Sequence, residues 1–301
     1  MISFRHHPLI GTFVDLTIVD DIDDHTAEAI DNTMVHEMER LESMCSIFNP
    51  KSELSRWRRG ETRTTSAELT ALLALGLEWQ IRTGGVFNTA SRLLTDRWRR
   101  AEAEQRIPSA GELADLAATI VEPRYVIDDR HASAIGDVSA IDLNALAKGW
   151  IVDRATELIT ERHPNVAFIV DAGGDLRHHG TTAIAVGIEN PLRPYDNEPP
   201  IARYELAGQA LATSGGARRG FVIGGHHYPH LIDPSTGQPT ERHASVSIIA
   251  PDAATADVLA TATSLLEAPA ALDLAQLVGV GCLVISPEGS LIWNDLGRPL
   301  T

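Results

Sequence analysis

Residues 142–153 read DLNALAKGWIVD, and with the residues up to 162 they form a strong helix candidate. Asp142 stands at the expected N-cap of this helix, and Lys148 lies two turns inside it. The free N–H groups at a helix start attract anions, so a lysine close by makes this a candidate anion site. An ordinary capped helix would account for the same residues, and the segment by itself leaves both interpretations open.

A strand and a glycine pair follow this helix directly. The run VAFIV (166–170) is apolar and β-branched, which predicts a strand, and DAGGD (171–175) comes immediately after it. Two adjacent glycines permit either a tight turn or a close approach of the backbone to a ligand. The two interpretations are equally good at this point.

The rest of the second half alternates short strands with helices. Asp252 is the expected cap of a helix over about 252–267, and CLVIS and LIWN flank a Pro-Glu-Gly-Ser turn at 287–290 as a hairpin would. The proline-rich stretch 190–200 predicts a loop. Further strands are expected at 183–188, 203–211, 221–223 and 244–250.

The first half is mainly helical, after a strand predicted at 9–20 and an acidic turn at 20–24. A first helix carries an apolar stripe at gaps of three and four, formed by Ile30, Met34, Met38, Leu41 and Cys45. Capping boxes at Thr65/Glu68 and Ser109/Glu112 predict two more helices. This mixed order predicts an α+β (mixed α/β) fold with no clean linker.

Composition limits the function classes. The chain has 301 residues and a formal net charge of −16, so non-specific nucleic-acid binding is not expected. Its two cysteines, Cys45 and Cys282, exclude a cysteine-based metal cluster and favour a reduced compartment. No apolar run reaches the roughly 18 residues that span a bilayer, and the N-terminus lacks a signal-peptide core. We therefore expect a cytoplasmic protein without a membrane span.

Two further segments contain residues suited to catalysis. In ADVLATA (256–262), Asp257 and Thr261 lie one turn apart on one helix face, and their hard oxygens suit a Mg²⁺ ion that also keeps water or phosphate ligands. In HLIDPSTGQP (230–239), an Asp-Pro start and a Thr-Gly end predict a rigid corner that would hold His230 as a positioned base. The alternatives are a helix with an unrelated acid and a structural turn with an incidental histidine.

Together these segments resemble the FAD:protein FMN transferase (ApbE) family. The resemblance runs through most of the chain in the family's order, and the DLNALAKGWIVD and HLIDPSTGQP blocks carry it most strongly. The other matching pieces are IGT (10–12), SIFNPKSELSRW (46–57), GGVFNTA (84–90), DAGGD (171–175), ATSG (212–215) and ADVLATA (256–262).

The resemblance implies a single domain over 1–301, with antiparallel-rich sheets flanked by helices in a T-fold-like architecture and FAD in a cleft between two interleaved subdomains. It implies that FAD and Mg²⁺ bind and that the FMN half moves to a threonine hydroxyl of an acceptor protein, with release of AMP. His230 matches the family's proposed base. The metal positions are Ala145, through its carbonyl, Asp257 and Thr261. The positions that contact FAD are Ile10, Phe48, Val86, Phe87, Asn88, Asp142 and Lys148.

Several positions depart from the family pattern. Asn88 stands where Asp is usual, Ala90 where Thr is usual, and the 84–94 segment lacks the family's Gly-Pro. Phe48 replaces a common Tyr, Ile10 the usual Met and Asp171 an Asn, while ATSG is followed by Gly216-Ala217-Arg218-Arg219 rather than by a tyrosine. The same metal ligands and base would also serve a Mg²⁺-dependent FAD pyrophosphatase that gives FMN and AMP, with water in place of the threonine hydroxyl. The departures near Asn88 motivate a second alternative, a non-catalytic FAD-binding protein.

Overall fold

The computed structural model describes residues 1–128, 130–195, 197–215 and 220–300. Its main feature is an eight-stranded antiparallel sheet in the order β1-β2-β5-β6-β9-β12-β13-β14. Those strands are β1 (Ile2–Leu9), β2 (Thr12–Ile18), β5 (Phe168–Ala172), β6 (Asp175–His179), β9 (Ala210–Ser214), β12 (Ser245–Ala250), β13 (Gly281–Ile285) and β14 (Leu291–Trp293). Three two-stranded sheets accompany it: β3 (Tyr125–Ile127) with β4 (Ala132–Ala134), β7 (Ile184–Ile188) with β8 (Ala202–Leu206), and β10 (Gly220–Ile223) with β11 (His226–Pro229).

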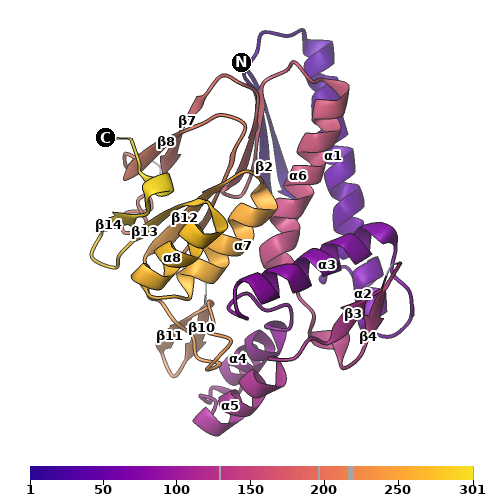
Figure 1. The fold of residues 1–301 in the computed structure, drawn as a ribbon, viewed down its shortest axis with the longest axis vertical. Helices are drawn as coiled ribbons and strands as arrows, with labels where there is room; N and C mark the ends of the chain where they lie inside the picture. The colour runs from indigo at the N-terminus through magenta and orange to yellow at the C-terminus, as the bar shows by residue number, and fades with distance from the viewer. Residues whose placement is uncertain (129, 196, 216–219, 301) are drawn as a thin grey trace.

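Helices pack on one face of the large sheet, where α6 runs alongside α1 and also contacts α7 (Figure 1). Successive side chains of a strand point to opposite faces of the sheet, and one set, including Val170 and Ile248, meets these helices in the main core. The helices are α1 (Asp24–Cys45), α2 (Glu53–Arg58), α3 (Ala67–Arg82), α4 (Arg92–Glu104), α5 (Ala110–Thr119), α6 (Asn144–Arg162), α7 (Ala253–Ser264) and α8 (Ala268–Val278). This arrangement confirms the predicted α+β class.

A second apolar cluster lies between the large sheet and the β7–β8 hairpin. It joins Leu211 and Ile285 of the sheet to Tyr204 and Leu206 of β8. The prediction of one domain with two interleaved subdomains is not tested by these clusters and stays a prediction.

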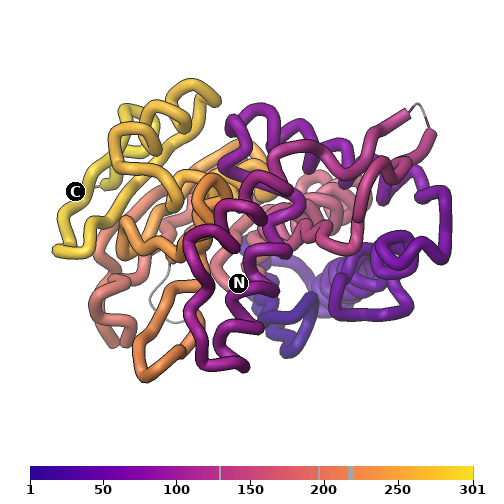
Figure 2. The backbone as a smooth tube through the Cα atoms, turned by 90° about the horizontal axis from the view of Figure 1, so that it is seen from below, coloured from indigo at the N-terminus to yellow at the C-terminus, as the bar shows by residue number. Residues whose placement is uncertain are grey.

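Segments far apart in the sequence meet beneath the sheet. Figure 2 shows the β10–β11 hairpin beside the α4–α5 region, and the Val222 N–H donates to Glu102 Oε1 at 2.6 Å. The Trp98 indole of α4 donates to the Gly237 carbonyl at 2.9 Å. These bonds tie the corner that follows β11 to the helical first half.

Most of the predicted elements are present, and the differences are local. The strand expected at 9–20 begins only at Thr12, because Ile10 and Gly11 both take positive φ (47° and 76°) and turn the chain between β1 and β2. The strand expected at 203–211 is two strands, β8 and β9. The N-cap of α3 is Ser66, whose side chain accepts from Leu69 N–H, rather than Thr65, whose hydroxyl is instead bonded to that of Thr70.

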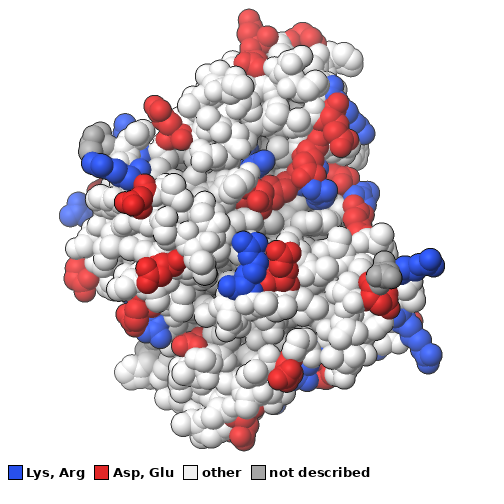
Figure 3. Space-filling view, viewed as in Figure 1, with Lys and Arg blue, Asp and Glu red and all other residues white. Residues whose placement is uncertain are grey.

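The surface agrees with the strongly acidic composition. On the face in Figure 3, acidic side chains outnumber basic ones over the α1–α6 side, and basic residues mostly lie next to acidic ones. Within the described ranges, no helix is both long enough and apolar enough to cross a membrane. The cytoplasmic location stays a prediction.

Candidate active site

The start of α6 is fixed to the 86–90 segment. The Asp142 N–H donates to the Thr89 carbonyl at 2.8 Å, and Asp142 Oδ1 accepts from Asn144 N–H at 2.9 Å. The N-cap residue by geometry is Leu143, so the expected cap position is one residue too early, although the Asp142 carboxylate still satisfies a free N–H of the first turn. Burial raises the pKa of Asp142, while Arg92 and Arg58 act to lower it.

Lys148 lies among carboxylates from two other elements. Its ammonium donates to Asp175, which begins β6 immediately after the glycine pair. Burial alone would lower the pKa of Lys148, but Asp257, Asp175 and Asp171 outweigh it and raise the pKa. Burial, and then the neighbouring Asp257, raise the pKa of Asp175 to about 8. Three carboxyl groups, those of Asp171, Asp175 and Asp257, thus act on the one ammonium of Lys148.

Asp257 reaches this cluster from α7. It is 7% exposed, and burial raises its pKa although Lys148 opposes the effect. Its Oδ2 accepts from the Gly149 N–H at 3.3 Å. In a regular helix that N–H would pair with the Ala145 carbonyl, so Ala145 and Asp257 belong to the same neighbourhood. Thr261 lies one turn beyond Asp257 on α7 and is half-buried.

The donor chemistry of this neighbourhood fits a hard divalent cation. Asp257, Thr261 and the Ala145 carbonyl offer oxygen ligands only, which is the set that Mg²⁺ prefers. Across the described ranges, no group of three or more His, Cys, Asp or Glu side chains is arranged around a metal position. A metal here would therefore complete its coordination with water and with oxygens of a bound ligand.

Two hairpin turns meet beside this cluster. Gly173 and Gly174 (φ 64° and 96°) turn β5 into β6, and a Cβ on Gly173 would lie 2.3 Å from Thr12 Oγ1. The pairing of Val14 with Ala172 places this turn next to the Ile10 turn. The glycine pair is thus a tight turn that also permits a close approach, although to Thr12 rather than to a ligand. Ile10 is β-branched, so its positive φ of 47° is a strained backbone conformation. Such strain is typical of functional sites.

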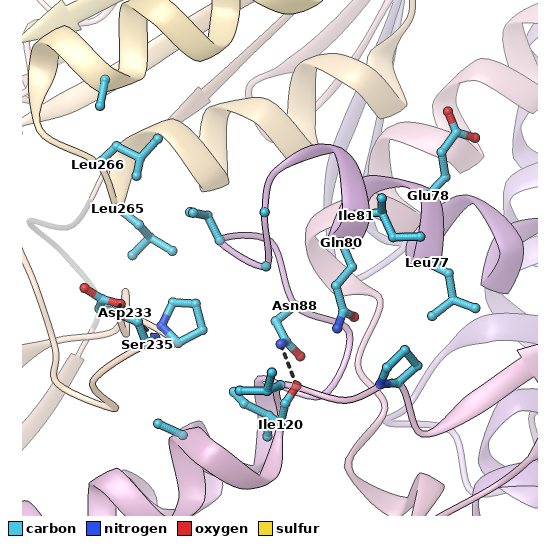
Figure 4. Close-up of a pocket in the computed structure, with 18 of the residues that line it drawn as sticks. Leu77, Glu78, Gln80, Ile81, Asn88, Ile120, Asp233, Ser235, Leu265 and Leu266 are labelled. Atoms are coloured by element: carbon cyan, nitrogen blue, oxygen red, sulfur yellow. Dashed lines mark hydrogen bonds between the residues drawn. The ribbon is translucent and has the colours of Figure 1, made fainter.

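A cavity of about 1070 Å³ opens between α3 and the corner after β11. Figure 4 shows Leu77, Gln80 and Ile81 on one side and Asp233, Ser235 and Leu265 on the other. Val86 and Asn88 line this cavity, whereas Phe87 is buried in the core. The lining is mostly apolar with a few polar groups, which is typical of sites for organic ligands.

The corner that follows His230 is rigid, as predicted. Asp233 accepts from Ser235 N–H at 2.9 Å through its side chain and from Gly237 N–H at 2.7 Å through its carbonyl. Arg242 forms an ion pair with Asp233 at 3.5 Å. His230 is half-buried and directly follows β11, and Asp233, three residues later, lines the cavity.

A model of the ApbE family matches residues 10–284. The chain belongs to the ApbE family. The FAD:protein FMN transferase of Haemophilus influenzae is 28% identical over 249 residues, which cover 77% of this chain and 70% of that protein. The Treponema pallidum enzyme of the same name is 31% identical over 243 residues, covering 73% and 66%. The crystal structure of the Thermotoga maritima ApbE protein aligns over 99% of both chains with a TM-score of 0.86 and 25% identity.

One departure from the ApbE pattern has a structural explanation. Asn88 Nδ2 donates to the Ile120 carbonyl at 2.9 Å, and Asn88 Oδ1 accepts from Ala90 N–H at 2.8 Å. Both ends of the amide are used, and an ionised aspartate could not make the first bond. Asn88 therefore fits its own surroundings.

The remaining predicted positions are more scattered. Phe48 lies between α1 and α2 and is 71% exposed, so its ring is open to a ligand. Residues 216–219, where the ApbE tyrosine is replaced, lie outside the described residues.

Asp175 and Gly149 belong to the site but were not predicted from the sequence. A glycine inside a long helix and an acid at the exit of a glycine turn were the available signals.

Proposed function

We propose that this protein is a Mg²⁺-dependent FAD:protein FMN transferase that moves FMN to a threonine hydroxyl of an acceptor protein and releases AMP. The observation that carries the proposal is the contact of the partly exposed Lys148 with the buried Asp175 and Asp257, which joins α6, β6 and α7. Clustered acids with a single lysine suit a cation and a phosphate-bearing ligand, and curated ApbE relatives bear this enzyme name.

In this proposal Asp257, Thr261 and the Ala145 carbonyl hold Mg²⁺. When bound, the ion neutralises pyrophosphate charge and stabilises the AMP leaving group. Lys148 adds a positive charge near the phosphates, which a chain of net charge −16 needs in order to attract FAD.

FAD occupies the cleft whose walls include the cavity lined by Val86 and Asn88. Phe87 is buried, so it contributes through its backbone, and the exposed Phe48 ring packs against the flavin. Ile10 and Asp142 complete the contacts. Because these groups come from separate elements, the folded chain orients FAD before any reaction takes place.

The reaction is a displacement at phosphorus. The acceptor threonine oxygen forms a bond to the FMN phosphorus, the pyrophosphate P–O bond breaks, and AMP leaves with the bonding electrons. His230 accepts the threonine proton, and its half-buried place beside the rigid corner keeps it oriented for that task.

The test is an incubation with FAD and Mg²⁺, with and without a peptide that contains a flavinylation-type threonine, followed by separation of the products. A flavin-labelled peptide together with AMP supports the proposal. AMP with free FMN in both reactions supports the pyrophosphatase, and intact bound FAD supports the binding protein. Either of the last two results overturns transferase activity toward that peptide.

A further inference from the structure

Asp153 links α6 to the first residues of α7. Its side chain is almost buried, and its Oδ1 and Oδ2 accept from the N–H groups of Ala253 and Ala254, each at 2.8 Å. The first N–H groups of a helix have no partner within the helix. A carboxylate on one helix therefore supplies the acceptors that the start of another helix needs.

Capping alone does not explain this second carboxylate. α7 already has its own N-cap, since Asp252 Oδ1 accepts from Thr255 N–H at 2.7 Å. Asp153 comes from a different element, and Arg177 of β6 lies 3.7 Å from it. The arrangement thus fixes α7 relative to α6 and β6 in addition to capping it.

The same interface carries the proposed metal donors. Ala145 and Lys148 precede Asp153 on α6, and Asp257 and Thr261 follow Ala253 on α7. The two helices touch at Gly149, whose N–H reaches Asp257 Oδ2. A shift of α7 along α6 would separate the oxygen donors on the two helices.

We propose that Asp153 is a positioning residue that sets the separation between the metal donors of α6 and those of α7. The inference rests on the proposed function, because it assumes that Mg²⁺ binds between these helices. Groups that orient metal ligands typically change metal affinity by roughly 10–100-fold when they are removed.

The test compares D153N with D252A in the full-length protein with FAD at pH 8. Burial raises the pKa of Asp153 to about 6, so the carboxyl is ionised under these conditions. D153N keeps the size of the side chain but places an N–H donor against one of the two α7 N–H groups. D252A removes the other cap of the same helix and leaves the link to α6 intact. The readout is the half-saturating concentration of Mn²⁺, a paramagnetic substitute for Mg²⁺, measured by electron paramagnetic resonance.

We expect D153N to raise the Mn²⁺ half-saturation about tenfold or more, and D252A to raise it less than about threefold even where both lower Tm similarly. An equal rise of the Mn²⁺ half-saturation in the two variants, or no rise in D153N, would overturn the inference. The proposed function would remain intact in that case, provided that the wild-type protein binds Mn²⁺. Wild-type protein that binds no Mn²⁺ beside FAD would overturn the proposed function and the inference together.

D153E keeps the experiment decisive if D153N does not fold. Glutamate retains both acceptors and the charge but lengthens the link by one methylene, so it changes the position of α7 rather than its capping. An increased Mn²⁺ half-saturation in D153E supports the positioning role, and wild-type affinity contradicts it.

Discussion

Gly149 of α6 lies directly against Ala253 of α7: a Cβ on Gly149 would come within 2.3 Å of the Ala253 carbonyl oxygen. Glycine inside a helix costs about 1 kcal/mol relative to alanine, so the close contact is what requires it here. We expect G149A to lower the free energy of unfolding by about 2 kcal/mol or more. It should also slow FAD cleavage about a hundredfold, because the helices that carry Lys148 and Asp257 move apart. Urea unfolding and AMP release measure the two effects.

Gly111 of α5 provides the matched control for this substitution. It lies in a helix, and nothing stands within 4 Å of the position a Cβ would take. G111A should therefore leave FAD cleavage unchanged and raise stability slightly, by about 0.5 kcal/mol. If G149A behaves like G111A, the helices tolerate a wider spacing than the structure indicates.

Asp257 should be essential for activity but not for folding. D257N removes a carboxylate whose pKa burial raises, so metal-free protein should lose little stability or gain some. Mg²⁺-dependent AMP release should fall at least about a thousandfold, since a direct oxygen ligand of the metal is lost. Tm without metal and AMP release with it separate the two effects. D273N, on the exposed surface of α8, is the control, and Mg²⁺-dependent release that persists in D257N would show that the metal site is elsewhere.

Local signals predicted α1, α3, α5, α6, α7 and the corner after β11, but not α2, α4 or α8, and not the contacts between elements. The stripe of Ile30, Met34 and Met38 is buried in α1, and the Ser109–Glu112 capping box is present as predicted. α8 was not predicted, since the helix expected over about 252–267 ends just before α8 begins at Ala268. Periodicity describes one element at a time.

The candidate site shows the same limit. Lys148 and Asp257 could be selected because each has a recognisable helix position in a segment that also resembles the ApbE family. Two of the contacts in the site join residues that are far apart in the sequence: the contact of Lys148 with Asp175 and the hydrogen bond from Asn88 to the Ile120 carbonyl. No local pattern encodes these pairings, so the reason for Asn88 in place of the family's aspartate becomes visible only in the folded chain.

Replacing Asn88 by the aspartate that is usual in the family should destabilise the fold. N88D removes the donor to the Ile120 carbonyl and places a charge in a nearly closed position, so we expect a loss of about 1–3 kcal/mol in the free energy of unfolding. Asn49 is the control, because its side-chain oxygen accepts from Lys51 N–H, a bond that aspartate can also make. N49D should be nearly neutral. Equal stabilities of N88D and wild type would mean that the Ile120 bond contributes nothing.

His230 should matter for proton transfer. If it accepts the threonine proton, H230A should reduce the rate of peptide flavinylation by about a hundredfold or more, with little change in FAD affinity. H226A, on the exposed part of β11, should keep the rate within about twofold of wild type. Single-turnover labelling of the peptide measures the rate, and fluorescence titration measures FAD affinity. A wild-type labelling rate in H230A assigns the base to another group.

The Glu112 carboxylate at the start of α5 should make the stability of the fold depend on pH in the acid range. Arg106, and then the Ser109 N–H, hold the pKa of Glu112 well below its usual 4.5. A carboxyl whose pKa is lowered on folding stabilises the fold above the unfolded value, and this contribution disappears as the pH falls below about 4.5 toward the folded value. E112Q keeps an acceptor for Ser109 N–H but loses the charge that faces Arg106. We expect a lower Tm for E112Q than for wild type at pH 7, with a difference that narrows steadily below pH 4.5.

The matched control for this pH dependence is E161Q, an exposed substitution near the end of α6. Both variants change the net charge by the same amount, so general charge effects cancel when their melting curves are compared from pH 3 to pH 8. Because Leu113 packs under Gly237, a looser α5 start should also weaken the support of the corner that follows His230. A Tm difference between E112Q and wild type that stays constant across this range would show that the charge of Glu112 beside Arg106 adds nothing to the free energy of unfolding.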